Sequence, residues 1–388
     1  MQVVPIHFQD LDFRHTFAMC RTRAGEMVRR WVPYGMPRFR PDIERVSFYL
    51  YRLDPRPHAK VGALQGPFGS GVVIELPASN PMLSKHVYAV TAAHVVATGA
   101  SIIRLNTKND DSPDLYGHRF MDELTPDDWV SIPGGHDVAV ADITDQLREG
   151  DWIRAARDVD FVTRDFIKQK KIGLGEDGFM LGLYVPSPGK KYNLPATRFG
   201  NIARLADDQH PVPQGHQIAH PSHIFDIHSR PGYSGSPVFL YRTPANDLTG
   251  INPKGHWDLN TTNNVFLALL GIHSGQFPDE INVETSDRPG AKEIAEIPGD
   301  PIHEGDKLFI PSSMTIVVPA WAIIDVLNLP IFKEQRTMRE RKELNDGTPK
   351  IMPEAVEPAP PATDANPNHR EDFTSLLTSA VRKPESKD

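Results

Sequence analysis

Between residues 46 and 330 this chain is a series of short apolar runs separated by clusters of proline, glycine, asparagine and aspartate. Proline accounts for 36 of the 388 residues, against a usual share of about 5%, and proline clashes inside helices and lacks a backbone donor. The runs are rich in valine, isoleucine, phenylalanine and tyrosine, which favour strands. The region therefore predicts a many-stranded antiparallel β domain. We expect strands at 46–53, 69–76, 87–91, 101–105, 138–143, 179–185, 238–241, 265–273 and 314–318.

The two ends of the chain have a different character. Residues 1–45 form an arginine-rich extension without clear periodicity, which we interpret as packed over the domain or partly loose rather than as a nucleic-acid-binding arm. Near the other end, residues 320–327 predict a short helix and 333–342 a highly charged one. Six prolines in 349–367, with few large apolar side chains, predict a disordered tail. A short helix at 374–382 would order only against a protein partner.

Composition excludes several classes of protein. With 42 basic and 50 acidic residues the formal net charge is −8, so the chain as a whole is not attracted to nucleic acid or to an anionic membrane. The single cysteine, Cys20, excludes an intramolecular disulfide and a multi-cysteine zinc site. The longest apolar stretch, 314–324, is shorter than the ~18 residues of a membrane span, and the N-terminus does not resemble a signal peptide. We therefore predict a cytoplasmic protein.

Three short motifs carry residues that can do chemistry. An apolar run ending in Thr-Ala-Ala-His places a histidine at His94, and His-Asp-Val-Ala-Val places Asp137 at the start of another run. The third motif, Gly-Tyr-Ser-Gly-Ser-Pro, holds Ser234 in a glycine-flanked turn before a strand. A serine hydroxyl needs a base such as histidine to accept its proton, and the imidazole needs a carboxylate to hold its tautomer. The backbone N–H groups of Gly232 and Ser234 are the expected donors to a tetrahedral oxyanion.

These motifs, in the order His94, Asp137, Ser234, resemble those of the trypsin/chymotrypsin-like serine peptidases. They are more similar to the bacterial HtrA-type and glutamyl-endopeptidase branches than to the digestive enzymes. The resemblance covers roughly residues 46–330. It implies a chymotrypsin-like double antiparallel β-barrel with a short C-terminal helix, 331–388 being a charged helix and disordered tail. It also implies serine endopeptidase activity on a polypeptide substrate through a Ser-His-Asp triad, without a cofactor or a metal.

Several alternatives accompany this assignment. Asp142 and Asp145 compete with Asp137 for the carboxylate role, and Ser236 competes with Ser234 for that of the nucleophile; the family pattern favours Asp137 and Ser234. The chain departs from the trypsin-type zymogens at Tyr233, where those proteins have an aspartate that pairs with a newly cut N-terminus. We therefore expect an enzyme that needs no N-terminal cleavage.

Substrate preference has its own candidate residues. Glutamyl endopeptidases resemble this chain in carrying a histidine at the position of His273 and a hydroxyl at that of Ser229, which suggests recognition of an acidic side chain. We place Ser274 and Gly275 on the same pocket wall and His228 at its floor. Residues 277–306 contain nine acidic and two basic residues, a net charge of −7 that would repel such a substrate. An ordinary packed role for His273 is an equal alternative.

Two further alternatives concern function as a whole. His216, His220, His223 and His228 are close together, but the prolines between them break any helix that would align them, so we interpret 216–228 as a loop rather than a zinc site. The competing function is a catalytically silent peptidase fold that acts as a peptide-binding or scaffold module. The C-terminal tail is the expected contact with any protein partner.

Overall fold

The computed structural model describes residues 17–21, 27–31, 41–56, 58, 60, 62–108, 116–185, 187–214, 218–230, 232–243, 266–282 and 307–346. The predicted disordered tail, the helix predicted at 374–382 and most of the acidic stretch 277–306 lie outside these residues. Within the described ranges, no helix is both long and apolar enough to cross a membrane.

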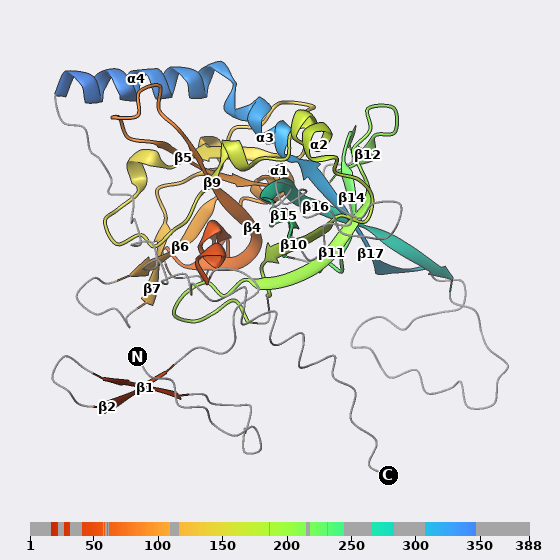
Figure 1. Cartoon of the computed structure of the whole chain (residues 1–388), viewed down its shortest axis with the longest axis horizontal. Helices are drawn as coiled ribbons and strands as arrows, with labels where there is room; N and C mark the ends of the chain where they lie inside the picture. Colours follow the sequence, from red (N-terminus) through yellow and green to blue (C-terminus); the bar gives the residue numbers. More distant parts are fainter. Residues whose placement is uncertain are drawn as a thin grey trace, which may run out of the picture.

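The C-terminal half of the domain is a closed barrel in which neighbouring strands are antiparallel (Figure 1). Every strand sends a buried apolar side chain into one common core, for example Met180, Phe225 and Leu270. Going round the barrel, the strands are β10 (Asp177–Gly182), β11 (Ala196–Arg204), β14 (His223–Asp226), β17 (Lys307–Pro319), β16 (Phe266–Asn282) and β15 (Pro237–Arg242).

The N-terminal half is a seven-stranded sheet. Its end strands β7 and β8 are not paired with each other in the described part of the chain, so this sheet is open where the C-terminal barrel is closed. The β class predicted from the sequence is confirmed, and of the two predicted antiparallel barrels the C-terminal one is closed, whereas the N-terminal one is an open sheet within the described residues. In order across the sheet, the strands are β7 (Tyr116–Met121), β6 (Ile102–Lys108), β3 (Ser47–Leu53), β4 (Leu64–Leu76), β5 (His86–Thr91) and β8 (Ala139–Asp142), and β9 (Ala156–Arg157) runs parallel to β4.

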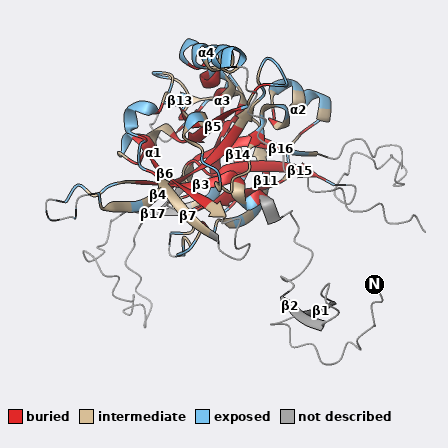
Figure 2. Ribbon diagram, turned by 90° about the vertical axis from the view of Figure 1, so that its left-hand side faces the viewer, coloured by how far each residue is buried: buried red, intermediate tan, exposed pale blue. Residues whose placement is uncertain are grey.

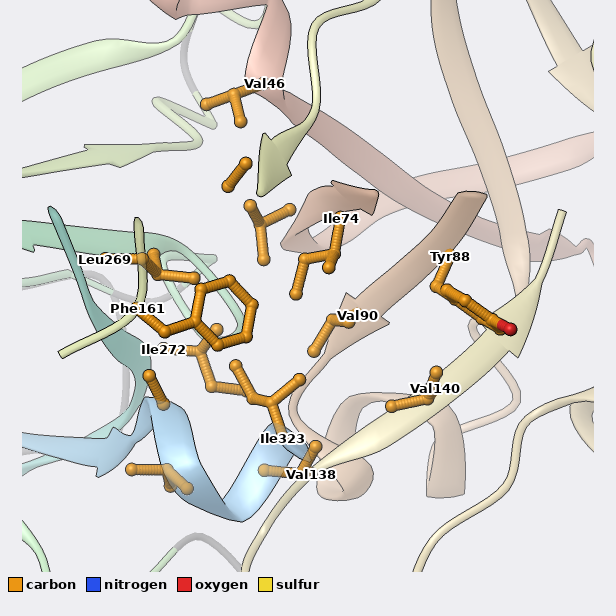
Figure 3. Close-up of a cluster of buried hydrophobic side chains, with 14 of the residues drawn as sticks. Val46, Ile74, Tyr88, Val90, Val138, Val140, Phe161, Leu269, Ile272 and Ile323 are labelled. Atoms are coloured by element: carbon orange, nitrogen blue, oxygen red, sulfur yellow. The ribbon is translucent and has the colours of Figure 1, made fainter. Parts of the chain in front are cut away.

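A core between the two halves explains why strand β5 has no polar face. Val87 and Ala89 pack inside the N-terminal sheet, whereas Tyr88 and Val90 point the other way, into a second cluster. In that cluster they meet barrel residues such as Ile272 (Figure 3). Both faces of the strand are therefore buried, as the continuous apolar run in the sequence requires, and the buried residues fill the centre of the molecule (Figure 2).

Within the described residues the helices are few, and all but the last have eight residues or fewer. The helix at 320–327 has the predicted bounds, and the charged helix is longer than the predicted 333–342. The helical segments are α1 (Ala93–Ala97), α2 (Arg164–Lys170), α3 (Ala320–Leu327) and α4 (Pro330–Asp346), with 3-10 turns η1 (Pro41–Val46), η2 (Pro126–Asp128), η3 (Thr144–Gln146) and η4 (Asp158–Asp160).

Some elements were not predicted. The N-terminal extension contains a hairpin, β1 (Phe17–Arg21) with β2 (Met27–Trp31). The interpretation of 216–228 as a loop is wrong in part, because β13 (Ala219–His220) pairs with β12 (Val212–Pro213) and β14 belongs to the barrel. Strand β14 was missed because it begins with a histidine, a polar residue that is not enriched in strands. In the structure His223 is fully buried, and burial lowers its pKa to about 3, which keeps the imidazole neutral.

Helix α4 is held against strand β5 of the N-terminal sheet. Phe332 is 1% exposed and packs edge-on against Tyr88, with ring centroids 5.5 Å apart. Around this contact Arg336 donates to the Tyr88 hydroxyl at 3.1 Å, and Glu340 lies 2.9 Å from Nε2 of the buried His86. Phe332 is the one buried residue of this helix, so a single aromatic ring anchors it.

We expect Phe332→Ala to lower the free energy of unfolding by about 3–5 kcal/mol, because it removes a buried ring and leaves a cavity. Urea denaturation of the full-length chain measures this change. Met338→Ala, on an exposed part of the same helix, is the matched control and should change stability by less than about 0.5 kcal/mol. Equal losses in the two variants would contradict the anchoring role of Phe332.

Candidate active site

His94 lies in the short helix α1, which starts where strand β5 ends. Its backbone N–H donates to Oδ1 of Asp137 at 2.9 Å, and its ring Nδ1 lies 2.7 Å from Oδ2 of the same carboxylate. The side chain is 26% exposed, so one edge of the imidazole remains accessible. The two bonds to one carboxylate fix both the backbone and the ring of this histidine.

Asp137 is completely buried just before strand β8. Besides His94, it accepts a hydrogen bond from the Ser274 hydroxyl at 2.6 Å. Burial raises the pKa of this carboxyl, but the hydrogen bonds from His94 and Ser274 and the charge of His94 together outweigh it, and the net pKa is lowered. The group is therefore a carboxylate in spite of its burial. Asp142 and Asp145, the alternatives from the sequence, instead pair with Arg339 of α4.

Ser234 stands in the turn that leads into barrel strand β15, and its Oγ lies 2.9 Å from Nε2 of His94. The sharp turn depends on glycine: Gly235 has φ +83°, and a Cβ there would lie 2.0 Å from the carbonyl oxygen of Ser70. Ser236, the alternative nucleophile, is fully buried, and its hydroxyl has no hydrogen-bond partner among the described residues. The structure thus brings Ser234, His94 and Asp137 into one chain of hydrogen bonds.

The backbone amides of Gly232 and Ser234 are the sequence-predicted oxyanion donors. Gly232 has φ +96°, a conformation that favours glycine. Neither amide donates a hydrogen bond within the part of the chain that the structure describes. Both are therefore available to a negatively charged oxygen placed beside Ser234.

Tyr233 takes the place of the zymogen aspartate and lies fully buried. Its hydroxyl accepts a hydrogen bond from Nε of Arg198 at 3.1 Å. Its ring packs against Gly182 so closely that a Cβ there would lie 2.1 Å from a ring carbon. Arg198 of strand β11 thus holds Tyr233, and with it the turn that carries Ser234.

The residues predicted for substrate preference fall into three groups. Ser229 and His273 are buried together, with Ser229 Oγ 2.7 Å from Nε2 of His273. The Ser274 hydroxyl donates to Asp137, and a Cβ at Gly275 would have no heavy atom of the described residues within 4 Å, its two chain neighbours aside. His228 is exposed. The structure brings together the histidine and the hydroxyl on which the predicted acidic preference depends.

Sequence reasoning missed a polar network behind Asp137. The Asp137 backbone N–H donates to Oε1 of Gln214 at 2.5 Å. The Gln214 amide nitrogen in turn lies 2.9 Å from Nδ1 of His136 and donates to the Ser222 hydroxyl at 2.9 Å. Gln214 is 77 positions from Asp137 in the chain, and no motif or spacing in the sequence indicates this contact.

In the part of the chain that the structure describes, no group of three or more histidine, cysteine, aspartate or glutamate side chains is placed to hold a metal ion. His220 packs against His136 with ring centroids 4.6 Å apart, and His223 lies edge-on to Trp321 at 5.2 Å. His216 lies outside the described residues.

Two buried histidines should make stability depend on pH. Burial lowers the pKa of both His223 and His273 to about 3, below the ~6.5 of an unfolded histidine. Between these values the unfolded chain binds more protons, so the free energy of unfolding should fall as the pH falls from 6.5 towards 3. Each group contributes a slope of up to about 1.4 kcal/mol per pH unit. Urea denaturation at several pH values tests this, and His273→Gln should reduce the slope; an unchanged slope would contradict it.

No protein-family model and no curated protein sequence matches this chain. Among solved structures it is similar to the active form of the Rv3671c protease from M. tuberculosis, with 15% sequence identity over 74% of this chain and 82% of that one, and a TM-score of 0.34. The inactive form of the Rv3671c protease gives 14% identity over 73% and 88% of the two chains, with a TM-score of 0.32. Because the identity and the TM-score are this low, the evidence for the fold is the strand pairing of this chain itself.

Proposed function

We propose that this chain is a serine endopeptidase. The observation that carries the proposal is the position of His94, whose two ring nitrogens lie 2.9 Å from the Ser234 hydroxyl and 2.7 Å from the Asp137 carboxylate. A nucleophile, a base within hydrogen-bond reach and a group that orients the base are together what acyl transfer by serine requires.

The reaction follows from this arrangement. His94 accepts the Ser234 proton through Nε2 while Oγ attacks the scissile carbonyl, and the Asp137 carboxylate stabilises the charged imidazole. The Gly232 and Ser234 amides donate to the oxyanion. His94 then delivers its proton to the leaving amine, and a water molecule repeats the sequence on the acyl-enzyme. Ser274 acts through Asp137, whose carboxylate it helps to keep ionised.

An extended polypeptide is the substrate that the neighbouring strand suits. Strand β16 pairs with β15 only as far as Ile272, and His273 still exchanges backbone hydrogen bonds with the nucleophile turn. Beyond it, Gly275 and Gln276 pair with β17 on one edge and have no strand partner on the other edge within the described residues. A substrate strand can add to the other edge by backbone hydrogen bonds, beside Ser234.

The buried pair of Ser229 and His273 supports a preference for an acidic side chain before the scissile bond, as in the glutamyl-endopeptidase branch. Because the pKa of His273 is lowered to about 3, its imidazole is neutral at pH 7, so the carboxylate would be bound by hydrogen bonds rather than by a fixed positive charge. A peptide library should show cleavage after glutamate or aspartate, reduced by Ser229→Ala. Cleavage without any acidic residue at that position would exclude this preference.

Fluorophosphonate labelling tests the proposed function itself. We expect the uncleaved full-length chain to be labelled at Ser234, since Tyr233 and Arg198 brace the nucleophile turn without a new N-terminus. Mass spectrometry of the labelled peptide identifies the site. An unlabelled chain that still binds peptides would favour the competing function, a silent peptidase fold serving as a binding module.

A further inference from the structure

Ser70 lies in the Gly69-Ser70-Gly71 segment of strand β4, in the N-terminal sheet, yet it bonds to residues that adjoin barrel strands β10 and β15. Ser70 is fully buried. Its backbone N–H donates to the carbonyl oxygen of Ser234 at 2.8 Å, and its hydroxyl donates to the carbonyl oxygen of Gly232 at 3.3 Å. One residue of the first sheet thus holds the carbonyls of both residues whose amides are the proposed oxyanion donors.

The direction of the Ser70 hydroxyl proton is determined by a third contact. The backbone N–H of Leu183, just after strand β10, donates to Ser70 Oγ at 3.0 Å. A hydroxyl has a single proton to donate. With one lone pair of the oxygen occupied by the Leu183 N–H, that proton is directed to the Gly232 carbonyl.

Ser70 has a glycine on either side, and both glycines lie in closely packed parts of strand β4. A Cβ at Gly69 would lie 2.7 Å from Val95 and 3.2 Å from the Ser234 carbonyl oxygen, and one at Gly71 would lie 2.1 Å from the Phe48 ring. The absence of a side chain at Gly69 therefore lets β4 approach the turn that carries Ser234, and its absence at Gly71 lets the same strand pack against Phe48 within the N-terminal sheet. The Ser70 carbonyl is held in turn by the Thr91 hydroxyl at 2.7 Å, next to the segment that carries His94.

Gly232 is the residue of the turn that most needs an external restraint. Glycine has the widest choice of backbone angles, and only one orientation of its peptide units aims the amide at the oxyanion. Donors to an oxyanion are effective because they are oriented before the reaction begins. The hydroxyl bond to the Gly232 carbonyl holds the peptide unit that follows Gly232. It thereby restrains the ψ angle of Gly232, which relates that unit to the one carrying the Gly232 amide.

We propose that Ser70 is a positioning residue for catalysis, which orients the oxyanion-binding turn from the opposite sheet through its hydroxyl. This inference rests on the proposed peptidase function. It predicts that loss of the hydroxyl lowers kcat rather than weakening substrate binding, because the oxyanion exists only during the reaction.

The test compares Ser70→Ala and Ser70→Cys with the wild-type full-length chain. Cysteine fills the space of serine but is a weak donor, so it separates loss of the hydrogen bond from loss of packing. The backbone bond to Ser234 remains in both variants. Ser101→Ala is the matched control, since Ser101 is also buried and its hydroxyl donates to a backbone carbonyl, that of Leu124 at 3.1 Å.

We expect kcat to fall by about 10- to 100-fold in both Ser70 variants, less than the 10²–10³ lost when an oxyanion donor itself is removed. KM should change by less than about threefold, and the affinity for a peptide boronate should fall in parallel with kcat/KM. Ser101→Ala should leave kcat unchanged. Thermal unfolding of each variant shows that it is folded.

Three results would overturn the inference. They are a kcat within twofold of wild type in Ser70→Ala, an effect confined to KM, and wild-type activity in Ser70→Cys. A wild-type chain that neither cleaves peptides nor reacts with fluorophosphonate at Ser234 would overturn the proposed function as well. A wild-type chain that does both, with Ser70 variants of unchanged kcat, would overturn the role of Ser70 alone.

Discussion

Replacing Ser234 by alanine should reduce kcat for peptide cleavage by about 10⁶-fold, close to the full effect of removing a triad. The reason is that in the proposed reaction Ser234 Oγ, 2.9 Å from Nε2 of His94, forms the acyl bond. Neither His94 nor the oxyanion amides can replace it. The rate with a peptide that wild type cleaves efficiently, measured by mass spectrometry over long incubation, gives the size of the loss.

Ser236→Ala is the matched control for this variant. Ser236 lies two positions further along and is fully buried, with a hydroxyl that has no partner among the described residues. Its removal should therefore leave kcat within a few-fold of wild type. If Ser234→Ala retained cleavage, or Ser236→Ala lost it, the assignment of the nucleophile would be wrong.

The second large effect is expected for Asp137→Asn, which should lower kcat by about 10⁴-fold, the loss that the equivalent change causes in a Ser-His-Asp triad. An amide in place of the carboxylate can donate to His94 Nδ1, so the imidazole would carry its proton on the nitrogen that must accept one from Ser234. Because Asp137 is completely buried, solvent cannot stabilise the charged imidazole in place of the lost carboxylate. KM should change much less than kcat.

Asp142→Asn is the control, because Asp142 lies on the strand that follows Asp137 but pairs with Arg339 of helix α4 at 3.0 Å. This variant should at most have a lower free energy of unfolding, and its kcat should be unchanged. Fluorophosphonate labelling should slow in Asp137→Asn and remain at the wild-type rate in Asp142→Asn. The reverse pattern would assign the carboxylate role to Asp142, the alternative that the sequence left open.

The parts of the fold that could be predicted from sequence are those with a local signal. Strand β5 is a continuous apolar run because both its faces are buried, and helix α3 follows a proline with the predicted bounds. Strand β14 has only two apolar residues, between a histidine and an aspartate, so nothing local distinguishes it from a loop. Its place in the barrel depends on neighbours 88 to 94 positions further along the chain, in β17.

The residues of the candidate site also divide into those with a local sequence signal and those without one. His94, Asp137 and Ser234 each stand in a short motif of small and apolar residues, and their order along the chain was enough to single them out. Ser274 was expected on the wall of a substrate pocket, but the structure shows its hydroxyl on Asp137, 137 positions away. No motif in the sequence indicates Gln214, although its side chain accepts a hydrogen bond from the Asp137 backbone.

By itself, then, the sequence determined the β class, the three residues of the proposed triad and the glycines of the nucleophile turn, because each of these is specified by a few adjacent residues. Only the tertiary structure decided which polar groups support them: Ser70 under the nucleophile turn, Ser274 and Gln214 around Asp137, and Arg198 on Tyr233. The physical reason is that these hydrogen bonds join residues more than 30 positions apart. Their geometry arises when a seven-stranded sheet and a barrel pack together, and no periodicity or spacing along the chain encodes it.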